Sequence, residues 1–353
     1  MALPTGGLIV AAYLVSAWRH EGTGLTTEIA TVLTLAVGAM CYWDYPALAA
    51  AVGVTTTVLL SLKPEMHAFA ERITREDLYA TLKLAVITVI VLPILPNEGF
   101  GPPPLDVLNP NRIWLMVVFI SGISFLGYVL IKVAGPRQGI SLSGLLGGLV
   151  SSTAVTLDFA ERSRQEEGLA TTFALAITIA WTMTFVRIAI EVAALNRMLL
   201  GVLWPPLAAA WASGMLYAGY LYLSRRTEKK REVDFSNPFE LGTALKFGLL
   251  FAVVLLISNA ASLYVGDVGV YVSSLISGLP GVDALTLSMA ELSGPGREVG
   301  VTTGARAIVI GAMANTGLKG GIILIRGSTP LRRALLPGLV LMLLAGVGVA
   351  FVI

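Results

Sequence analysis

Long apolar runs separated by short polar stretches recur along nearly the whole chain. Runs of about 18 residues or more are long enough to cross the roughly 30 Å hydrocarbon core of a bilayer as helices. We place such spans near residues 3–18, 25–43, 44–62, 79–96, 112–134, 168–195, 198–224, 240–265, 301–325 and 332–353. The pattern therefore predicts an all-α polytopic membrane protein with about ten transmembrane helices. The period-2 alternation of a transmembrane barrel is not found in the sequence.

Composition agrees with this pattern. The chain is 56% hydrophobic and only 13% charged, whereas soluble domains carry about 25% charged residues. Its mean hydropathy is +0.80. A net charge of +2 gives no basic surface for nucleic acid, so we expect the lipid bilayer to be the main environment and no nucleic-acid partner.

Two stretches, 139–161 and 269–291, do not fit a plain membrane span. Residues 139–161 read GISLSGLLGGLVSSTAVTLDFAE, and 269–291 read GVYVSSLISGLPGVDALTLSMAE. Aligned with a shift of 130 residues, they are identical at ten of twenty-three positions without a gap. An Asn-Pro pair precedes each half, at 109–110 and at 237–238. We interpret this as an internal duplication, with halves at 109–224 and 240–353, a cytoplasmic linker at 225–239 and a separate N-terminal part at 1–96.

Lysines and arginines decide how the two odd stretches enter the membrane, because cytoplasmic loops are enriched in these residues. If both stretches cross, the repeat is parallel and the basic linker 225–239 lies outside. If both leave on the side where they enter, sixteen of the 24 basic residues lie in cytoplasmic loops and three lie outside. The second arrangement predicts two re-entrant or broken helices and an inverted structural repeat. Such repeats are a recurrent architecture of transporters, with the substrate site near the bilayer midplane.

Polar residues in and after the re-entrant elements form the candidate site. A backbone that turns at membrane depth must face protein or a watery cavity, and ionisable groups at that depth are costly and suggest function. The candidate ion- or substrate-binding residues are Ser151, Ser152, Thr153, Thr156, Asp158, Asp283, Thr286, Arg187, Asn315 and Lys319.

The charge of the ligand is left open by these residues. Asp158 and Asp283 would bind a metal or another hard cation, two basic residues with helix N-termini suit an anion, and both together suit a zwitterion. A purely structural role is the alternative, in which Arg187 pairs with Glu191 or Asp158, and Lys319 pairs with Asp283.

Residues suited to catalysis are scarce. Cys41 is the sole cysteine, and the two histidines, His20 and His67, lie far apart in the sequence. We therefore expect no enzyme activity and no cofactor, and we leave homo-oligomerisation open. No ATP-binding GxxxxGK[ST] motif is present, so we expect the movement of a solute to be passive or ion-coupled.

Several stretches are similar to known sequences. GLTTEIATVLTLAVGA (24–39) resembles the latter part of the membrane domain of MgtC/SapB-like proteins. Residues 109–156, 237–252 and 277–288, with the motifs GGLVSSTA and GLPGVDALT, resemble the domain of unknown function fused behind that domain. The resemblance implies the plasma membrane of a bacterium or archaeon and no established activity or site residues. MgtC itself is associated with adaptation to magnesium limitation. Residues 1–96 look like a remnant of its domain, without the opening spans and the GLERE-like and LRT-like motifs expected there.

Together these observations predict a membrane transporter or channel for a small inorganic ion or small polar solute. Its site would lie at the midplane between the two inverted re-entrant elements. The alternative is a membrane regulator that transports nothing and binds another membrane protein, as MgtC-like proteins in magnesium homeostasis would. A wet cavity between the two elements would favour transport, whereas a dry, salt-bridged interior would favour the regulator.

Overall fold

A computed structural model describes residues 25–63, 74–134, 140–224 and 241–352. The predicted span 3–18, the linker 225–239 and both histidines lie outside the described residues. The chain divides into two compact units, 1–74 and 75–353, which are described separately. Residues 75–94, which the sequence groups with the N-terminal part, belong to the larger unit.

The smaller unit contains two apolar helices. These are α2 (Leu25–Tyr42) and α3 (Pro46–Ser61), which pack against each other. Pro46 opens α3, where its missing N–H costs no helical hydrogen bond. Both helices fall in the predicted spans 25–43 and 44–62. Their apolar stretches, Ile29–Tyr42 and Pro46–Ser61, are shorter than the segments of 18 residues or more that are long enough to cross a membrane.

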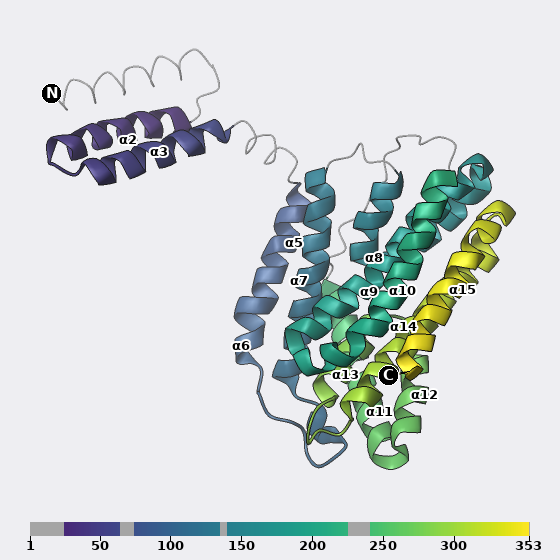
Figure 1. Ribbon diagram of the computed structural model, residues 1–353. Coiled ribbons are helices and arrows are strands. Elements are labelled where there is room, and N and C mark those ends of the chain that lie inside the picture. Colours follow the sequence, from purple (N-terminus) through teal and green to yellow (C-terminus); the bar gives the residue numbers. More distant parts are fainter. Residues whose placement is uncertain (1–24, 64–73, 135–139, 225–240, 353) are drawn as a thin grey trace. The chain divides into compact units, whose positions relative to one another are not determined.

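The larger unit is built of helices throughout its described residues (Figure 1). It begins with α5 (Arg75–Ala85), a π-helical turn (Val86–Val91) and α6 (Leu92–Ile94). A loop with a short 3-10 turn (Leu105–Val107) leads to the main bundle. The bundle helices are α7 (Pro110–Ala134), α8 (Ile140–Gln165), α9 (Ala170–Leu195), α10 (Arg197–Ser224), α11 (Leu241–Val265), α12 (Asp267–Gly278), α13 (Val282–Leu292), α14 (Val301–Arg326) and α15 (Thr329–Val352).

Eight helical segments in the described chain are long and apolar enough to cross a membrane. They correspond to the predicted spans from 79–96 onward, together with α8. The protein is therefore a polytopic all-α membrane protein, as the sequence predicts. Two differences concern the described residues. The helices in the predicted spans 25–43 and 44–62 are not among the eight, and α8 has the length of a crossing helix although the sequence predicts a re-entrant one.

A break at Ser151 shows how α8 is arranged. Ser151 has φ −159° and ψ 97°, an extended conformation inside an otherwise helical segment. Its Oγ accepts a hydrogen bond of 3.2 Å from the backbone N–H of Ala154, which is the contact of an N-cap residue. The segment is therefore two helices, 140–150 and 152–165, and Ser151 caps the second.

Both ends of α8 lie at the same end of the bundle. Its C-terminal part meets the junction of α14 and α15, where the backbone N–H of Ser328 donates to Ser163 Oγ at 2.9 Å. Its N-terminal part follows α7, which starts at the opposite end, where Arg112 pairs with Glu291. We call the two ends of the bundle the Ser163 end and the Glu291 end. Because α7 rises from the Glu291 end, α8 both begins and ends at the Ser163 end.

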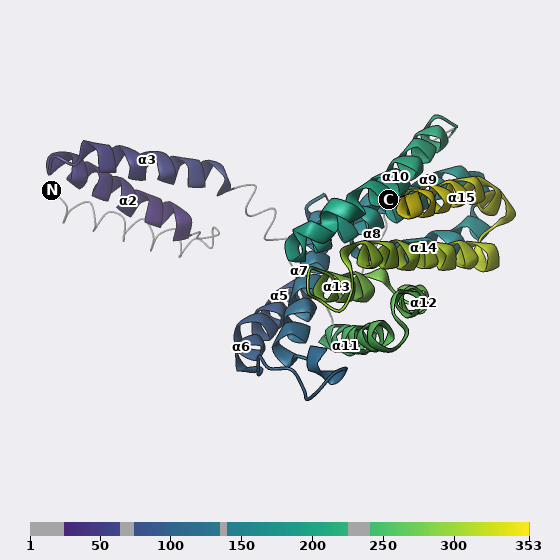
Figure 2. The same ribbon diagram turned by 60° about the horizontal axis from the view of Figure 1, so that its bottom comes forward.

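The second broken helix, formed by α12 and α13, turns back at the opposite end of the bundle. The chain leaves the helical conformation after α12 and resumes at α13, whose N-cap Gly281 has φ 172° and ψ 136°. α12 starts where α11 ends, and there Asn259 donates to the carbonyl of Pro104, in the loop before α7. α13 ends at Glu291 and Leu292. Both ends of the α12–α13 pair therefore lie at the Glu291 end, and Figure 2 shows the pair between α11 and α14.

The order and directions of the helices confirm an inverted repeat. In the first half, α7 runs to the Ser163 end, α8 turns back there, α9 runs away and α10 returns. In the second half, α11 runs to the Glu291 end, α12 and α13 turn back there, α14 runs away and α15 returns. In Figure 1 the α14–α15 junction lies at the upper right and the α11–α12 junction at the bottom.

Small residues allow both broken helices to approach their neighbours closely. A Cβ added to Gly148 would lie 2.6 Å from the Cα of Ala180 in α9. At the equivalent Gly278, an added Cβ would lie 2.5 Å from the Cα of Gly311 in α14. These are backbone-to-backbone contacts of the kind that small residues permit in membrane helices.

The two halves are also tied to each other at both ends of the bundle. Asn196 caps α10 through its contact with the N–H of Leu199 and donates to the carbonyl of Ser293 at 2.8 Å. At the other end, Ser328 contacts Ser163, which the 130-residue shift makes the equivalent of Ser293. Each half thus holds the outer end of the other half's broken helix.

Candidate functional site

Arg187 lies where the two broken helices meet. It is 9% exposed and projects from α9. Its Nη1 donates to the carbonyls of Leu149 and Val150, at 3.3 and 3.2 Å, in the last turn before the Ser151 break. These carbonyls have lost their helical partners, because the helix ends there. Arg187 therefore holds the tip of the first broken helix.

The same arginine reaches the second broken helix. Arg187 Nη2 lies 2.6 Å from Asp283 Oδ2, in the first turn of α13. Its Nε lies 3.2 Å from Glu191 Oε1, one turn later on α9. Glu191 is fully buried, and within the described chain its Oε2 has no hydrogen-bond partner. One guanidinium thus donates hydrogen bonds to two carboxylates and two carbonyls.

Asn315 binds a backbone carbonyl in the last turn before the break of the second broken helix, as Arg187 does in the first. Its Nδ2 donates to the carbonyl of Leu279 at 3.2 Å. Leu279 is the repeat equivalent of Leu149, and both carbonyls lie in the turn before the break. Each broken helix therefore has a carbonyl at its tip bound by a polar side chain of the following span.

A second polar group begins at Lys319. This side chain is 1% exposed, and its Nζ lies 3.3 Å from Thr184 Oγ1. Thr184 Oγ1 in turn lies 3.0 Å from the Oγ of Ser152, the first residue after the cap of the second half of α8. Lys319, Thr184 and Ser152 therefore form a connected row at the N-terminus of helix 152–165.

Thr156 extends this row. Its Oγ1 donates to the carbonyl of Ser152 at 2.7 Å and accepts from Trp181 Nε1 at 2.9 Å. Trp181 is 1% exposed and is among the largest fully buried side chains. The indole fixes the first turn after the break against α9.

The remaining sequence-derived candidates are distributed unevenly. Ser151 serves as the cap of helix 152–165. Thr286 is fully buried, and its Oγ1 has no hydrogen-bond partner in the described part of the structure. Thr153 is half-buried next to the break.

Asp158 does not join the central group, which corrects the prediction from sequence. Its Oδ1 lies 2.8 Å from Arg162 Nε, and the two side chains are 40% and 31% exposed. Arg162 lies one helical turn later, so the carboxylate has a nearer partner than Arg187. Asp158 also lies seven residues, roughly 10 Å along a helix, beyond the break.

A metal centre is not assembled from carboxylates in the described chain. No group of three or more His, Cys, Asp or Glu side chains is close enough there to hold a metal ion. Asp158 and Asp283, the pair considered for a cation, are each bound by an arginine instead.

The sequence indicates Glu191 only as an alternative partner of Arg187 and does not place Thr184 or Trp181 in the site. The repeat alignment indicates Thr184 when it is extended to the following spans, where the shift is 132 residues. Thr184 then matches Thr316, and Arg187 matches Lys319. Trp181 gave no such signal, since a tryptophan in an apolar span is unremarkable without its contact to Thr156.

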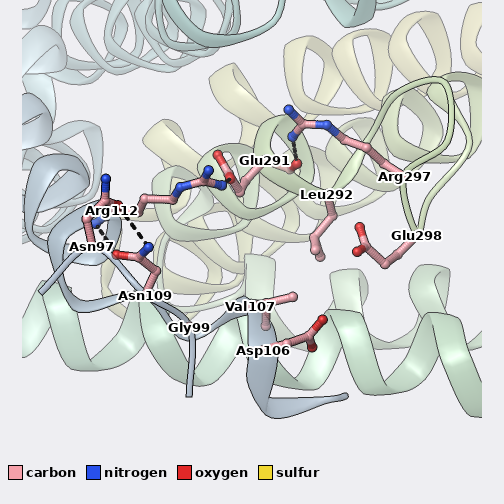
Figure 3. Close-up of a pocket in the computed structure, with 10 residues that line it drawn as sticks. All are labelled: Asn97, Gly99, Asp106, Val107, Asn109, Arg112, Glu291, Leu292, Arg297 and Glu298. Carbon is pink, nitrogen blue, oxygen red and sulfur yellow. Dashed lines mark hydrogen bonds and ion pairs between the residues drawn. The ribbon is translucent and has the colours of Figure 1, made fainter. Parts of the chain in front are cut away.

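A polar pocket of about 500 Å³ lies at the Glu291 end. Figure 3 shows Arg112 directed at the carboxylate of Glu291, and Arg297 folded onto the backbone carbonyl of the same residue. Residues of the loop before α7, of the end of α13 and of the loop after it line this pocket: Asn97, Gly99, Asp106, Val107, Asn109, Arg112, Glu291, Leu292, Arg297 and Glu298. From Glu291, α13 leads back to Asp283 at the central group.

Comparisons with known proteins concern the part of the chain that holds this site. Residues 118–327 match the family described as "Domain of unknown function (DUF4010)". A protein of Aquifex aeolicus (strain VF5), named "Uncharacterized protein", is 34% identical over 193 residues, which are 54% of this chain and 84% of that protein. No solved structure matches the chain.

The family match covers both broken helices and every residue of the central group. It does not extend to residues 1–96, whose resemblance to MgtC/SapB-like proteins stays a prediction. The chain therefore belongs to the family that carries the domain of unknown function DUF4010.

Proposed function

We propose that the protein is a transporter or channel for a small inorganic ion or small polar solute. The observation that carries the proposal is the meeting of two oppositely inserted broken helices at a buried cluster of charged and hydroxyl side chains. Discontinuous helices with their ends at the midplane are the way in which transporters expose backbone dipoles to a solute. A protein that only packs in lipid gains nothing from the cost of buried charges.

Each broken helix runs from one face of the protein to the central group. The pocket at the Glu291 end adjoins the outer end of α13, and Asp283 lies at the inner end of the same short helix. At the Ser163 end, the second half of α8 runs in the same way from its outer end to Ser152. Each broken helix thus joins one face of the protein to the central group.

The ion pairs between the two halves at the two faces suit alternating access. Arg112 with Glu291, and Arg326 with Glu161, join opposite halves at opposite faces. Exposed ion pairs of this kind contribute only about 0–1 kcal/mol. Such pairs can open and close without a large energy cost, so they are compatible with one face opening while the other stays closed.

We propose a multi-pass location in a prokaryotic plasma membrane, with the Ser163 end in the cytoplasm. The helix ends and loops there carry Arg162, Arg164, Arg326, Arg332 and Arg333, whereas the Glu291 end has Arg112, Arg197 and Arg297. This bias is the one that the positive-inside rule describes.

The direct test is a flux assay with purified protein in liposomes, against a panel of cations, anions and amino acids. We expect protein-dependent uptake of one class of solute that Asp283→Asn reduces at least tenfold. Absence of protein-dependent flux for the whole panel would contradict the proposal.

A membrane regulator is the second candidate, and one observation favours it. Arg187 contacts the carboxylates of Glu191 and Asp283 and two backbone carbonyls. This part of the interior is therefore salt-bridged and stabilised without a ligand. A regulator would bind a partner membrane protein and show no flux. Co-purification of such a partner, together with inactive liposomes, would favour this candidate.

A further inference from the structure

We infer that the central site binds a small inorganic anion, held by the ammonium of Lys319 and the hydroxyls of Thr184 and Ser152 at the N-terminus of helix 152–165. This inference rests on the proposed function, because it names the class of solute that the same site would take. It goes beyond the sequence, which leaves cation, anion and zwitterion open.

Lys319 is buried and has few partners. Its side chain is 1% exposed, yet an ammonium has three N–H donors. Within the described chain, the hydroxyl of Thr184 at 3.3 Å is its hydrogen-bond partner, and no carboxylate forms an ion pair with it. A buried charge is costly unless it is paired and hydrogen-bonded. An anion beside Nζ would supply the counter-charge and the acceptors that Thr184 alone does not supply, and would so favour the ammonium form.

A helix begins at Ser152, which is connected to Lys319 through Thr184. Ser152 follows the cap residue Ser151, so it lies in the first turn of a helix that runs to Gln165. The first N–H groups of a helix have no partner inside the helix. Among the described residues, Ser151 Oγ accepts the N–H of Ala154. Free amide groups and the helix dipole make such a terminus favourable for anions. Here a buried cation and two hydroxyls are added to it.

The candidate carboxylates for a cation are paired with arginines. A cation site would need free carboxylate oxygens, but Asp283 is bound to Arg187 and Asp158 to Arg162. Glu191 retains one unpartnered oxygen, Oε2, while its Oε1 contacts the same Arg187. Binding capacity for a cation is thus largely used inside the protein, whereas capacity for an anion remains at Lys319.

Close packing where the helices break limits the size of the ligand. The tips are closely packed, since Gly148 lies against Ala180 and Gly278 against Gly311 without room for a Cβ. The hydroxyls of Thr184 and Ser152 are already within hydrogen-bond distance of each other. A compact inorganic anion requires less displacement of these groups than an organic acid does.

The experiment measures binding separately from transport. Purified protein in detergent is titrated with chloride, nitrate, sulfate and phosphate at constant ionic strength, and tryptophan fluorescence and the melting temperature are followed. Trp181 contacts Thr156 in the same row, so it reports on the site, and Trp181→Phe identifies its share of the signal. We expect saturable binding of at least one anion, weakened at least tenfold by Lys319→Met and several-fold by Thr184→Val.

Lys246→Met is the matched control, because Lys246 is an exposed lysine in α11; it should leave anion binding unchanged. If Lys319→Met does not fold, Thr184→Val, which removes a hydroxyl at nearly constant volume, decides the question. Binding that is the same in wild type, Lys319→Met and Thr184→Val would overturn the inference, as would the absence of saturable binding for all four anions.

Flux in liposomes separates this inference from the proposed function. Transport of a cation or amino acid that does not depend on Lys319 would overturn the anion site and leave the transporter intact. Lys319-dependent anion binding without any flux would support the anion site and count against transport.

Discussion

The guanidinium of Arg187 lies 2.6 Å from the carboxylate of Asp283 and so connects the two halves of the repeat at the depth where both broken helices end. Arg187 belongs to the third element of the first half, and Asp283 opens the second short helix of the other half. The pair forms only when both tips are in place. Its behaviour therefore reports on the central arrangement.

Replacing Asp283 by Asn should impair transport while the protein remains folded. The amide keeps the shape and can still accept a hydrogen bond from Arg187, and Glu191 remains as a counter-charge. We expect flux in liposomes to fall at least tenfold and the melting temperature to change by only a few degrees. Asp267→Asn, at the exposed start of α12, is the control and should behave as wild type. Wild-type flux in Asp283→Asn would remove this residue from the site.

Replacing Arg187 by Lys should destabilise the protein although the charge is conserved. Arg187 uses three nitrogens to contact Glu191, Asp283 and two carbonyls. Lysine is a point charge and cannot reproduce this fork. Losing part of a buried network costs about 2–4 kcal/mol, so thermal unfolding in detergent should begin several degrees lower. Arg197→Lys, at an exposed position, should show no shift, and equal melting of the two variants would argue against the structural role of Arg187.

Replacing Gly278 by Ala should lower stability through a steric clash. The added Cβ would lie 2.5 Å from the Cα of Gly311, and overpacking of this kind costs about 1–3 kcal/mol. Gly317→Ala is the matched control, since an added Cβ there meets no atom within 4 Å. In that helix, alanine should be neutral or stabilising by up to about 1 kcal/mol. Melting temperatures of the two variants check this, and an unchanged value for Gly278→Ala would contradict the close packing of α12 on α14.

Neutralising the ion pairs at the two faces should have little effect on stability. Glu161 and its partner Arg326 are 55% and 57% exposed, and Arg112, the partner of Glu291, is 60% exposed. Solvent screening limits such pairs to about 1 kcal/mol or less. Glu161→Gln and Glu291→Gln should therefore melt within a few degrees of wild type. A large loss of stability in either variant would show that the faces are locked rather than easily opened.

The broken helices were predictable because the duplication preserves the residues that break them. Gly148 and Gly278 align, and so do Ser151 and Gly281, which are the caps of the second short helices. An internal repeat marks such positions even in a single sequence. The bias of basic residues then predicted that the two elements enter from opposite sides.

The pairing inside the site was only partly predictable. Arg187 was expected to contact Glu191 or Asp158, but its contact with Asp283 depends on how the halves pack, which no local pattern encodes. Asp158 was misplaced because an i,i+4 pair with Arg162 competes with any longer-range partner. The expected pairing of Lys319 with Asp283 does not form among the described residues, and Lys319 contacts Thr184 instead.

Site-directed labelling tests the opposite insertion of the two broken helices most directly. With Cys41 replaced by Ser, single cysteines are introduced at Gln165, the exposed end of α8, and at Glu298, in the exposed loop after α13. A membrane-impermeant maleimide is then applied to intact cells and to inverted vesicles. We predict that the Gln165 cysteine reacts only from the cytoplasmic side and the Glu298 cysteine only from outside. Reaction of both cysteines from the same side would contradict the inverted arrangement and, with it, the central site.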